Sequence, residues 1–481
     1  MTSYDLIIKD GKFVIPKIGL VEADLGIENG KIIRIDKNIS YNATDKVINA
    51  NKKVIFPGIV DAHSHFGIYR PLTIDARTES CAAVTGGITT VLNIVRPRPY
   101  YLNMTGPLIN LFNRLLELSK ENYLVDYGYA LAPVERSHLE EIEYLIDQGV
   151  STYKFFMHYR DYNFSEEPYD TGFLLDLMEK INEMNQKKNK ISRLSIHCED
   201  PEIIRVKGKT GYGIVLNKGY KPPLLLDKNP LKNYYLARPP IAEAAAIAKA
   251  MLMAYETKCP INILHITSEF ALSTIRSLLG NFKVDATFEA TIHHLTLTIE
   301  SNAGILAKVN PPIREKRDVE ALWNAIETGL INVVASDHAC TPIDMKRGDA
   351  YSAMFGFGGN TLLCPIMINE GFHKRGIPLT KIAELISYNP SKIHGFYPRK
   401  GTISVGSDAD LTIVDVNKEQ KVTTEILNSA QEYTPFEGML LKGWPITTII
   451  RGKVIFDNGT IVKAFGYGEY IKRPVENDIF I

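Results

Sequence analysis

Short runs of alternating apolar and polar residues fill the first 57 positions of the chain, and this pattern indicates β-strands. Asp10-Gly11 and Asn29-Gly30 each stand between two such runs. Asp-Gly and Asn-Gly pairs in this setting are typical of β-hairpin turns. The segment is too short to form a stable sheet domain alone, so we expect it to pair with strands from elsewhere in the chain.

From residue 58 the pattern changes to apolar runs of strand length that alternate with amphipathic stretches of helix length. Strands are predicted near residues 59–65, 89–95, 124–131, 151–157, 193–198, 260–266, 283–289 and 332–337. Helices are predicted over residues 103–120, 136–148, 173–187, 241–257, 268–279 and 318–328, with a last one near 379–388. Eight alternating strands favour a parallel sheet closed as a (β/α)8 barrel. An open doubly wound sheet is the alternative, but no Gly-x-Gly-x-x-Gly follows a predicted strand.

Strand-like runs return after the last helix, at residues 402–404, 410–414 and 446–456. We expect them to pair with the N-terminal strands. The predicted fold class is therefore α/β, a (β/α)8 TIM-like barrel with a small β-sandwich domain built from both chain ends. Residues 58–397 form the barrel in this interpretation, residues 1–57 and 398–466 form the sandwich, and residues 467–481 form a C-terminal arm.

Composition excludes several classes of function. The 481 residues carry 55 basic and 55 acidic side chains, so no basic footprint for nucleic acid is present. No apolar run is long enough to span a bilayer, and the N-terminus reads as a strand rather than a signal peptide. The five cysteines are odd in number and widely spaced, which favours a reduced, cytoplasmic protein over a disulfide framework.

Side chains that can bind a metal recur at the ends of the predicted barrel strands. In a barrel, catalytic groups gather at the C-terminal ends of the strands. His63 and His65 end the first strand, and side chains two residues apart point to the same side. His197, His265 and Asp337 follow apolar runs at the ends of the fifth, sixth and eighth strands. Imidazole and carboxylate groups are zinc ligands, so this recurrence predicts a metal site.

Lys154 is a further candidate because it lies in the aromatic fourth strand, among Tyr153, Phe155 and Phe156. Burial of a bare ammonium is costly, so Lys154 either reaches outward or pairs with a carboxylate, or burial lowers its pKa and yields a reactive neutral amine. One product of such an amine is a carbamate, whose two oxygens can bridge two metals. The residues alone leave these alternatives open.

The other histidines singled out are interpreted as structural, and His338 is expected to point away from Asp337 because strand neighbours alternate. These histidines are His138, His158, His293, His294, His338, His373 and His394.

With these residues the chain resembles the amidohydrolase superfamily, in particular the cyclic amidases, which comprise dihydropyrimidinases, hydantoinases, allantoinases and dihydroorotases. The resemblance extends over nearly the whole chain. Its motifs are Pro57-Gly58-Ile59-Val60-Asp61-Ala62-His63-Ser64-His65, Lys154 in Tyr-Lys-Phe-Phe-Met, His197, His265, Asn310-Pro311-Pro312, Ser336-Asp337-His338 and Gly406-Ser407-Asp408-Ala409-Asp410-Leu411.

The resemblance implies two Zn²⁺ or other divalent ions per chain. His63, His65 and Asp337 would bind the first, His197 and His265 the second, and carboxylated Lys154 would bridge them. It also implies that a metal-bridging hydroxide opens the amide ring of a small molecule while Asp337 shuttles the proton. The family further implies a homodimer or homotetramer. A non-catalytic scaffold homologue that has lost ligands is the remote alternative, but all six positions are filled here.

The residues that would determine substrate preference match different members of the family. Tyr159 matches a tyrosine that helps to hold the carbonyl or oxyanion in dihydropyrimidinases and hydantoinases. Asn310 and the loop near Gly356 to Asn360, with Gly358 as its named residue, are predicted to offer groups to the ring. The motif Val-Asn-Pro-Pro, however, more closely resembles the corresponding motif of dihydroorotases.

The arginine that binds a carboxylate in dihydroorotases is replaced here by Gly67. Arg70 or Arg96 would have to take over that role from a nearby loop. We therefore expect dihydropyrimidinase or hydantoinase activity first, and dihydroorotase or allantoinase activity second.

Overall fold

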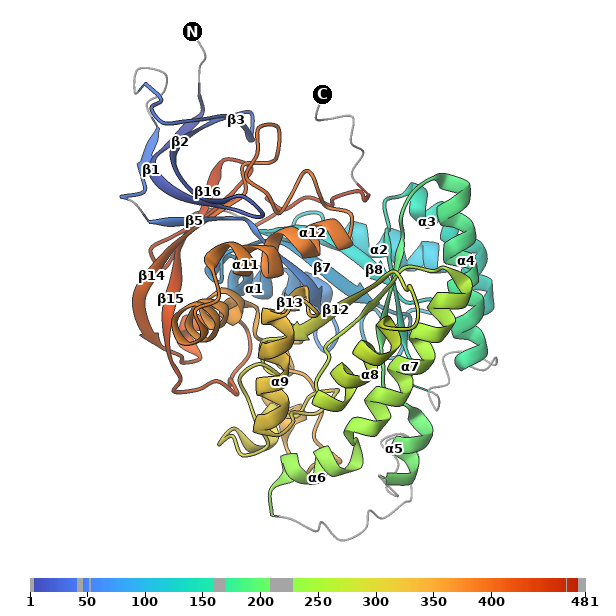
Figure 1. Ribbon diagram of the computed structural model, residues 1–481. Coiled ribbons are helices and arrows are strands. Elements are labelled where there is room, and N and C mark those ends of the chain that lie inside the picture. The colour runs from blue at the N-terminus through green and yellow to red at the C-terminus, as the bar shows by residue number, and fades with distance from the viewer. Residues whose placement is uncertain are drawn as a thin grey trace.

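The computed structural model describes residues 4–40, 46–51, 53–159, 169–207, 228–463 and 465–474. Its centre is an eight-stranded parallel sheet that curves into a nearly closed barrel (Figure 1). Its strands are β6 (Ile59–Ser64), β7 (Ile88–Val95), β8 (Asp126–Leu131), β9 (Thr152–Phe156), β10 (Arg193–His197), β11 (Ile261–Ile263), β12 (Ala286–Thr291) and β13 (Val333–Ala335). They are hydrogen-bonded in sequence order, which confirms the predicted barrel.

The first and last strands meet through a few specific contacts. Ser64 and His338 form a parallel bridge, and the backbone N–H of His65 donates to the carbonyl of His338 at 2.7 Å. The buried carboxylate of Asp61 accepts from the backbone N–H of Ser336 at 3.0 Å. These contacts hold the ends of β6 and β13 together, and both strands lead into candidate metal ligands.

Helices surround the barrel (Figure 1). They include α2 (Leu108–Ser119), α3 (Ile142–Asp147), α4 (Thr171–Lys188), α7 (Pro240–Thr257), α8 (Glu269–Leu279) and α9 (Lys316–Glu327), all within or near predicted ranges. Shorter helices are α5 (Pro201–Lys207), α6 (Pro230–Ala237), α10 (Leu363–Ile366), α11 (Leu379–Ala383) and α12 (Asn389–Ile393). No helix in the described ranges combines the length and apolarity needed to cross a membrane.

Helix α1 (Leu72–Thr85) was not predicted from the sequence, and its burial pattern explains why. Asp75, Glu79 and Ser80 are all buried on this helix. Polar residues therefore face the interior together with apolar ones, and the helical period that marks a surface helix is absent.

The two chain ends build a separate sheet beside the barrel, as predicted, with blue N-terminal strands next to red C-terminal ones (Figure 1). Hydrogen bonds join nine strands into this sheet. They are β1 (Leu6–Ile15), β2 (Gly19–Glu28), β3 (Lys31–Asp36), β4 (Val47–Asn49), β5 (Val54–Pro57), β14 (Leu411–Lys421), β15 (Leu440–Ile450), β16 (Lys453–Asp457) and β17 (Thr460–Ile461).

One of the two predicted hairpin turns is wrong. Asn29-Gly30 does separate β2 from β3, but β1 runs straight through Asp10-Gly11. The pairing of β1 with β2 shifts register there, and Asp10 adopts a φ of 52°. An Asp-Gly pair suits a bulge as well as a turn, because both need a residue in the left-handed region.

The C-terminal segment returns to the barrel. The backbone N–H of Ile471 donates to the carbonyl of Tyr127 at 2.8 Å, and that of Arg473 to the carbonyl of Gly149 at 3.1 Å. The last seven residues of the predicted arm, 475–481, lie outside the described residues.

Candidate active site

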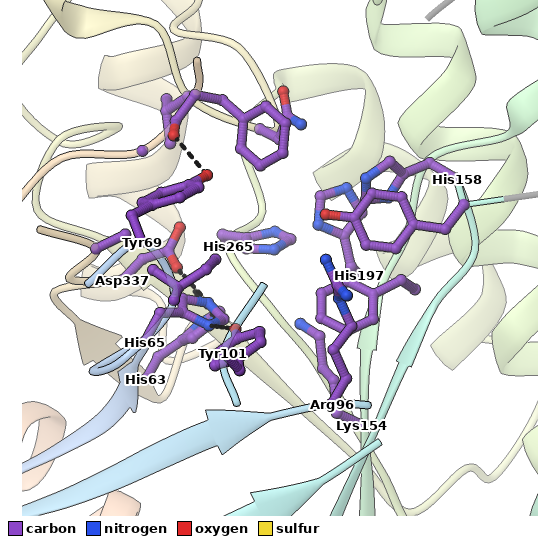
Figure 2. Close-up of a pocket in the computed structure, with 18 residues that line it drawn as sticks. His63, His65, Tyr69, Arg96, Tyr101, Lys154, His158, His197, His265 and Asp337 are labelled. Atoms are coloured by element: carbon purple, nitrogen blue, oxygen red, sulfur yellow. Dashed lines mark hydrogen bonds and ion pairs between the residues drawn. The ribbon is translucent and has the colours of Figure 1, made fainter. Parts of the chain in front are cut away.

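A pocket lies at the ends of the barrel strands, where the sequence predicts the metal ligands (Figure 2). All six predicted ligand residues line it, and so do Tyr159 and Asn310. His63, His65 and Asp337 lie on one side in Figure 2, Lys154 and His197 on the other, and His265 between them.

Three candidate ligands converge on one point. His63 Nε2 and His65 Nε2 lie 3.2 Å apart, and each lies 3.2 Å from Asp337 Oδ1. Neighbouring ligand atoms of a tetrahedral zinc ion are about 3.3 Å apart, given zinc–nitrogen bonds of 2.0–2.1 Å. The three atoms therefore form one face of a tetrahedron of the right size for such an ion.

The opposite side, together with His265 between the two sides, holds buried polar groups that have no partner in the described part of the chain. Lys154 Nζ and His265 Nδ1 are buried and have no hydrogen-bond partner among the described residues. The rings of His197 and His265 lie 4.4 Å apart between centroids. Buried polar atoms are rarely left unsatisfied, and imidazole nitrogens are metal donors. This side thus fits a second cation.

Burial sets the protonation of these groups. It lowers the pKa of both His65 and His197 to about 4, so both are neutral near pH 7. Burial also lowers the pKa of Lys154 to about 8. For Asp337 burial alone would raise the pKa, but the adjacent His63 and His65 outweigh it and hold that pKa well below its usual range. The site therefore offers neutral imidazoles and an ionised carboxylate, the forms that bind metals.

Each of three candidate ligands is oriented by a further residue. His63 Nδ1 lies 2.8 Å from Glu289 Oε1, His65 Nδ1 lies 2.7 Å from the Tyr101 hydroxyl, and His197 Nε2 lies 2.6 Å from Glu199 Oε2. Metal-binding histidines commonly donate their second ring N–H in this way. Glu199, although close enough to His158 and His197 to suggest another metal group, is already ion-paired with buried Arg238.

Two candidate ligands have unusual backbone conformations. Asp337 adopts a φ of 51° and His265 a φ of 34°. Residues other than glycine seldom occupy this left-handed region, and such residues cluster at functional sites.

The substrate side of the pocket carries aromatic and amide groups. Tyr159 is buried, and the Arg96 guanidinium carbon lies 5.4 Å from its ring centroid. The side-chain oxygen of Asn310 accepts from the Tyr234 hydroxyl, whereas its Nδ2 has no partner among the described residues. Asn310 thus leaves an amide donor available at the pocket.

Comparison with known proteins places this geometry in a family. The amidohydrolase family matches residues 232–455. A D-hydantoinase from Ralstonia pickettii is 30% identical over 98% of this chain and 99% of its own length. The chain belongs to the cyclic amidase group of the amidohydrolases.

Further similarities support this membership. An allantoinase from Rubrobacter xylanophilus is 29% identical to this cyclic amidase, over 96% of the present chain and 97% of its own. A solved structure of a D-hydantoinase matches with a TM-score of 0.85 and 30% identity, and covers 98% of this chain and 99% of its own.

Two residues considered from the sequence do not line the pocket of this cyclic amidase. The backbone N–H of Gly358 donates to Gln431 Oε1, and a Cβ at this glycine would meet His338 Cε1 at 2.8 Å. Gly356, two residues earlier, lines the pocket instead. Arg70 lies 3.7 Å from Glu432, outside the pocket lining, whereas Arg96 is part of it.

His158 was interpreted as structural but lines the pocket, with its ring centroid 4.0 Å from that of His197. Continuing the alternation of β9 two residues past its last residue would have found it, because His158 follows Lys154 and Phe156 at the same spacing of two. Tyr101 also lines the pocket. No sequence period marks it, since it lies in the irregular segment after β7.

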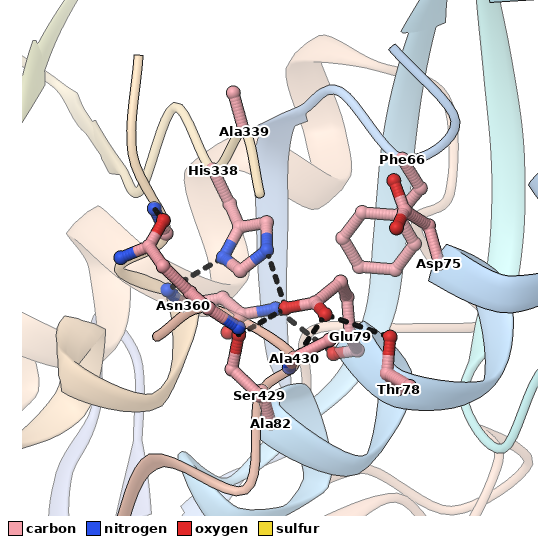
Figure 3. A network of polar contacts seen from close by, with 12 residues as sticks. Phe66, Asp75, Thr78, Glu79, Ala82, His338, Ala339, Asn360, Ser429 and Ala430 are labelled. Carbon is pink, nitrogen blue, oxygen red and sulfur yellow. Dashed lines mark hydrogen bonds and ion pairs between the residues drawn. The ribbon is translucent and has the colours of Figure 1, made fainter. Parts of the chain in front are cut away.

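His338 points away from the pocket, as alternation predicts, into a buried polar network (Figure 3). Its Nδ1 accepts from the backbone N–H of Gly359 at 3.1 Å, and its Nε2 lies 2.9 Å from Glu79 Oε2. Glu79 also accepts from the Ser429 hydroxyl. The network ties α1 to the segment that carries Asp337.

Proposed function

We propose that this chain hydrolyses a ring amide of a small cyclic molecule, with neutral dihydropyrimidine and hydantoin rings as the preferred substrates. The observation that carries the proposal is the three-atom face of His63, His65 and Asp337 opposite the buried amine of Lys154. The similarity to proteins named D-hydantoinase and allantoinase supports the same reaction class.

Two divalent cations would occupy the site, and Zn²⁺ is the ion that we propose. His63, His65 and Asp337 would hold one, His197 and His265 the other, and a carboxylated Lys154 would connect them. Such cations polarise a carbonyl and lower the pKa of water.

Asp337 would transfer the proton from the attacking water to the leaving nitrogen. Its carboxylate is ionised and lies beside His63 and His65, so its oxygens are free of a proton and would accept one from the attacking water. Amide nitrogens leave poorly as anions, and Asp337 would return this proton to the ring nitrogen as the carbon–nitrogen bond breaks.

Tyr159 and Asn310 would hold the ring. Burial raises the pKa of Tyr159, although the Arg96 charge opposes this shift, so the phenol keeps its proton near neutral pH. It can therefore donate a hydrogen bond to the oxyanion as it develops. The Asn310 Nδ2 group supplies a second donor toward the ring.

A second candidate function is hydrolysis of a ring that bears a carboxylate, such as dihydroorotate. Arg96 favours it, because this guanidinium lines the pocket and is 3% exposed. Allantoin, a neutral ring, is the substrate that the names of several relatives support.

The test is a side-by-side assay of ring opening with dihydrouracil, 5-substituted hydantoins, allantoin and dihydroorotate. We expect a neutral dihydropyrimidine or hydantoin to be turned over best. Tyr159→Phe should lower turnover by roughly 10²–10³, the usual loss for one oxyanion donor, with metal retained. Tyr144→Phe, which alters a half-exposed tyrosine on α3, is the matched control.

Preferred turnover of dihydroorotate, lost in Arg96→Gln, would establish the second candidate. A metal-loaded enzyme that opens none of the four rings would overturn the proposed function.

A further inference from the structure

Two neighbouring candidate ligands are oriented by chemically different partners. His63 is backed by the Glu289 carboxylate, whereas His65 is backed by the Tyr101 hydroxyl at 2.7 Å. Figure 2 shows His65 beside Tyr101. The Nε2 atoms of both histidines face each other and Asp337. A neutral imidazole that offers its Nε2 lone pair carries its proton on Nδ1. His65 Nδ1–H therefore donates, and the Tyr101 oxygen accepts.

This direction leaves the hydroxyl hydrogen of Tyr101 unused by His65. A carboxylate in the same place, as at His63, would have no hydrogen to offer. Tyr101 lines the pocket, so its hydrogen can reach a molecule bound there. A tyrosine hydroxyl accepts and donates at once, and this dual capacity distinguishes Tyr101 from Glu289.

The loop that carries Tyr101 is held firmly in place. The backbone N–H of Tyr101 donates to the carbonyl of Ile68 at 3.2 Å, which joins the segment after β7 to the segment after β6. Arg96 Nη1 donates to the carbonyl of Pro99 at 2.6 Å. The Arg96 guanidinium carbon lies 5.6 Å from the ring centroid of Tyr101 and 5.4 Å from that of Tyr159. One cation thus contacts both phenols.

We propose that Tyr101 is a second substrate-binding phenol, which accepts the Nδ1 proton of His65 and donates its own hydroxyl proton to a carbonyl oxygen of the cyclic substrate. The proposal rests on the proposed function for the identity of its ligand. It makes Tyr101 both a positioning residue for His65 and a contact for the ring, on the side of the pocket opposite Lys154 and His197.

The test compares Tyr101→Phe with Tyr100→Phe, a neighbouring tyrosine that is not among the pocket-lining residues. Metal affinity is measured first, by competition of the purified proteins with a chromogenic chelator for zinc. Tyr101→Phe should bind zinc roughly 10- to 100-fold more weakly, as is usual when the partner of a metal-binding histidine is lost. Tyr100→Phe should match the parent, and equal unfolding midpoints would show that both variants fold.

Kinetics at saturating zinc then separate the two roles of Tyr101. We expect kcat/KM of Tyr101→Phe to stay roughly tenfold below the parent, the loss of one neutral hydrogen bond. Full recovery of kcat and KM with excess zinc would overturn the substrate contact. Unchanged zinc affinity would overturn the contact with His65. If the parent opens no cyclic amide, the proposed function fails, while the zinc competition still tests Tyr101.

Discussion

The surroundings of Lys154 disfavour a charged ammonium group. Its ammonium would be fully buried, 4.5 Å from the ring centroid of Phe156 and without a hydrogen-bond partner among the described residues. Burial lowers its pKa to about 8, so a sizeable fraction is the neutral amine at pH 8. Carbon dioxide reacts with the neutral amine. The resulting carbamate would supply a negatively charged group to connect the two proposed cations.

Lys154→Ala should lose nearly all activity, because it removes the group proposed to connect the two cations. A short carboxylic acid such as acetate or propionate should restore part of the turnover by supplying oxygens at the same place. Lys154→Arg should not recover, since guanidinium stays charged and forms no carbamate. Initial rates with and without added acid measure this, and an active arginine variant would refute the bridging role.

His63→Ala should remove one corner of the three-atom face and lower bound metal from about two ions per chain to one or fewer. Activity should fall with the metal. His373→Ala is the matched control, because its ring lies near the surface and bonds the carbonyl of Val416. Elemental analysis of dialysed protein gives the metal content. Full turnover by metal-stripped parent protein would contradict a metal-dependent reaction.

Residues at or just beyond the end of a barrel strand were predictable from the residue pattern, whereas Tyr101 on an irregular loop was not. The ligand candidates His63, His197 and His265 follow apolar runs, so barrel topology alone brings them together. Tyr101 reaches His65 only through an irregular loop whose path no residue period encodes. Of the predicted loop from Gly356 to Asn360, Gly356 lines the pocket and Gly358 does not, a difference that the sequence of the loop does not encode.

At the scale of elements, the buried strands were found because apolar runs between turns have few other interpretations. Helix α1 could not be predicted from the residue pattern because its inward face carries Asp75, Glu79 and Ser80. A polar residue that is buried beside a partner from a distant segment looks, in sequence, like one exposed to water. The network of Glu79 with His338 (Figure 3) is such a case.

Asp75 on α1 gives a prediction about pH and stability. Burial, and after it the Glu79 carboxylate one turn away, raises the pKa of Asp75 to about 7. The folded chain thus binds this proton more tightly than the unfolded chain, so its contribution to stability is lost as pH rises from about 4 to about 7. The difference from an unfolded aspartate corresponds to roughly 4 kcal/mol.

Asp75→Asn cannot ionise, so its free energy of unfolding should decline less than that of the parent between pH 5 and pH 8. The Asn oxygen can still accept from the backbone N–H of Gly67, as Asp75 does. Urea unfolding at both pH values measures the difference. Asp344→Asn, at an exposed aspartate, should follow the parent, and an identical decline in Asp75→Asn would disprove the assignment.

At the scale of the whole molecule, a buried ion cluster fastens the chain-end sheet to the barrel, at the end of β8 away from the pocket. Lys400 Nζ lies 2.8 Å from both Asp408 Oδ2 and Asp410 Oδ2, and it also contacts Asp126 at the start of β8. Arg451 contacts Asp126 as well. The sequence does not reveal this cluster, because Asp126 lies far from Lys400 and Arg451 along the chain.

Lys400→Met should therefore destabilise the protein strongly. The side chain of Lys400 is 0% exposed and that of Asp410 is 2% exposed. Methionine would therefore leave the buried Asp410 carboxylate without its ion-pair partner, at a cost of about 3–5 kcal/mol. Lys374→Met is the matched control, since Lys374 is 59% exposed in its pair with Glu370 and such pairs contribute at most about 1 kcal/mol. Denaturant unfolding of both variants provides the comparison. The folded fraction of Lys400→Met should keep the parent kcat, because the cluster lies far from the pocket. A loss of stability no larger than that of Lys374→Met would mean that apolar packing, not the ion cluster, holds the two units together.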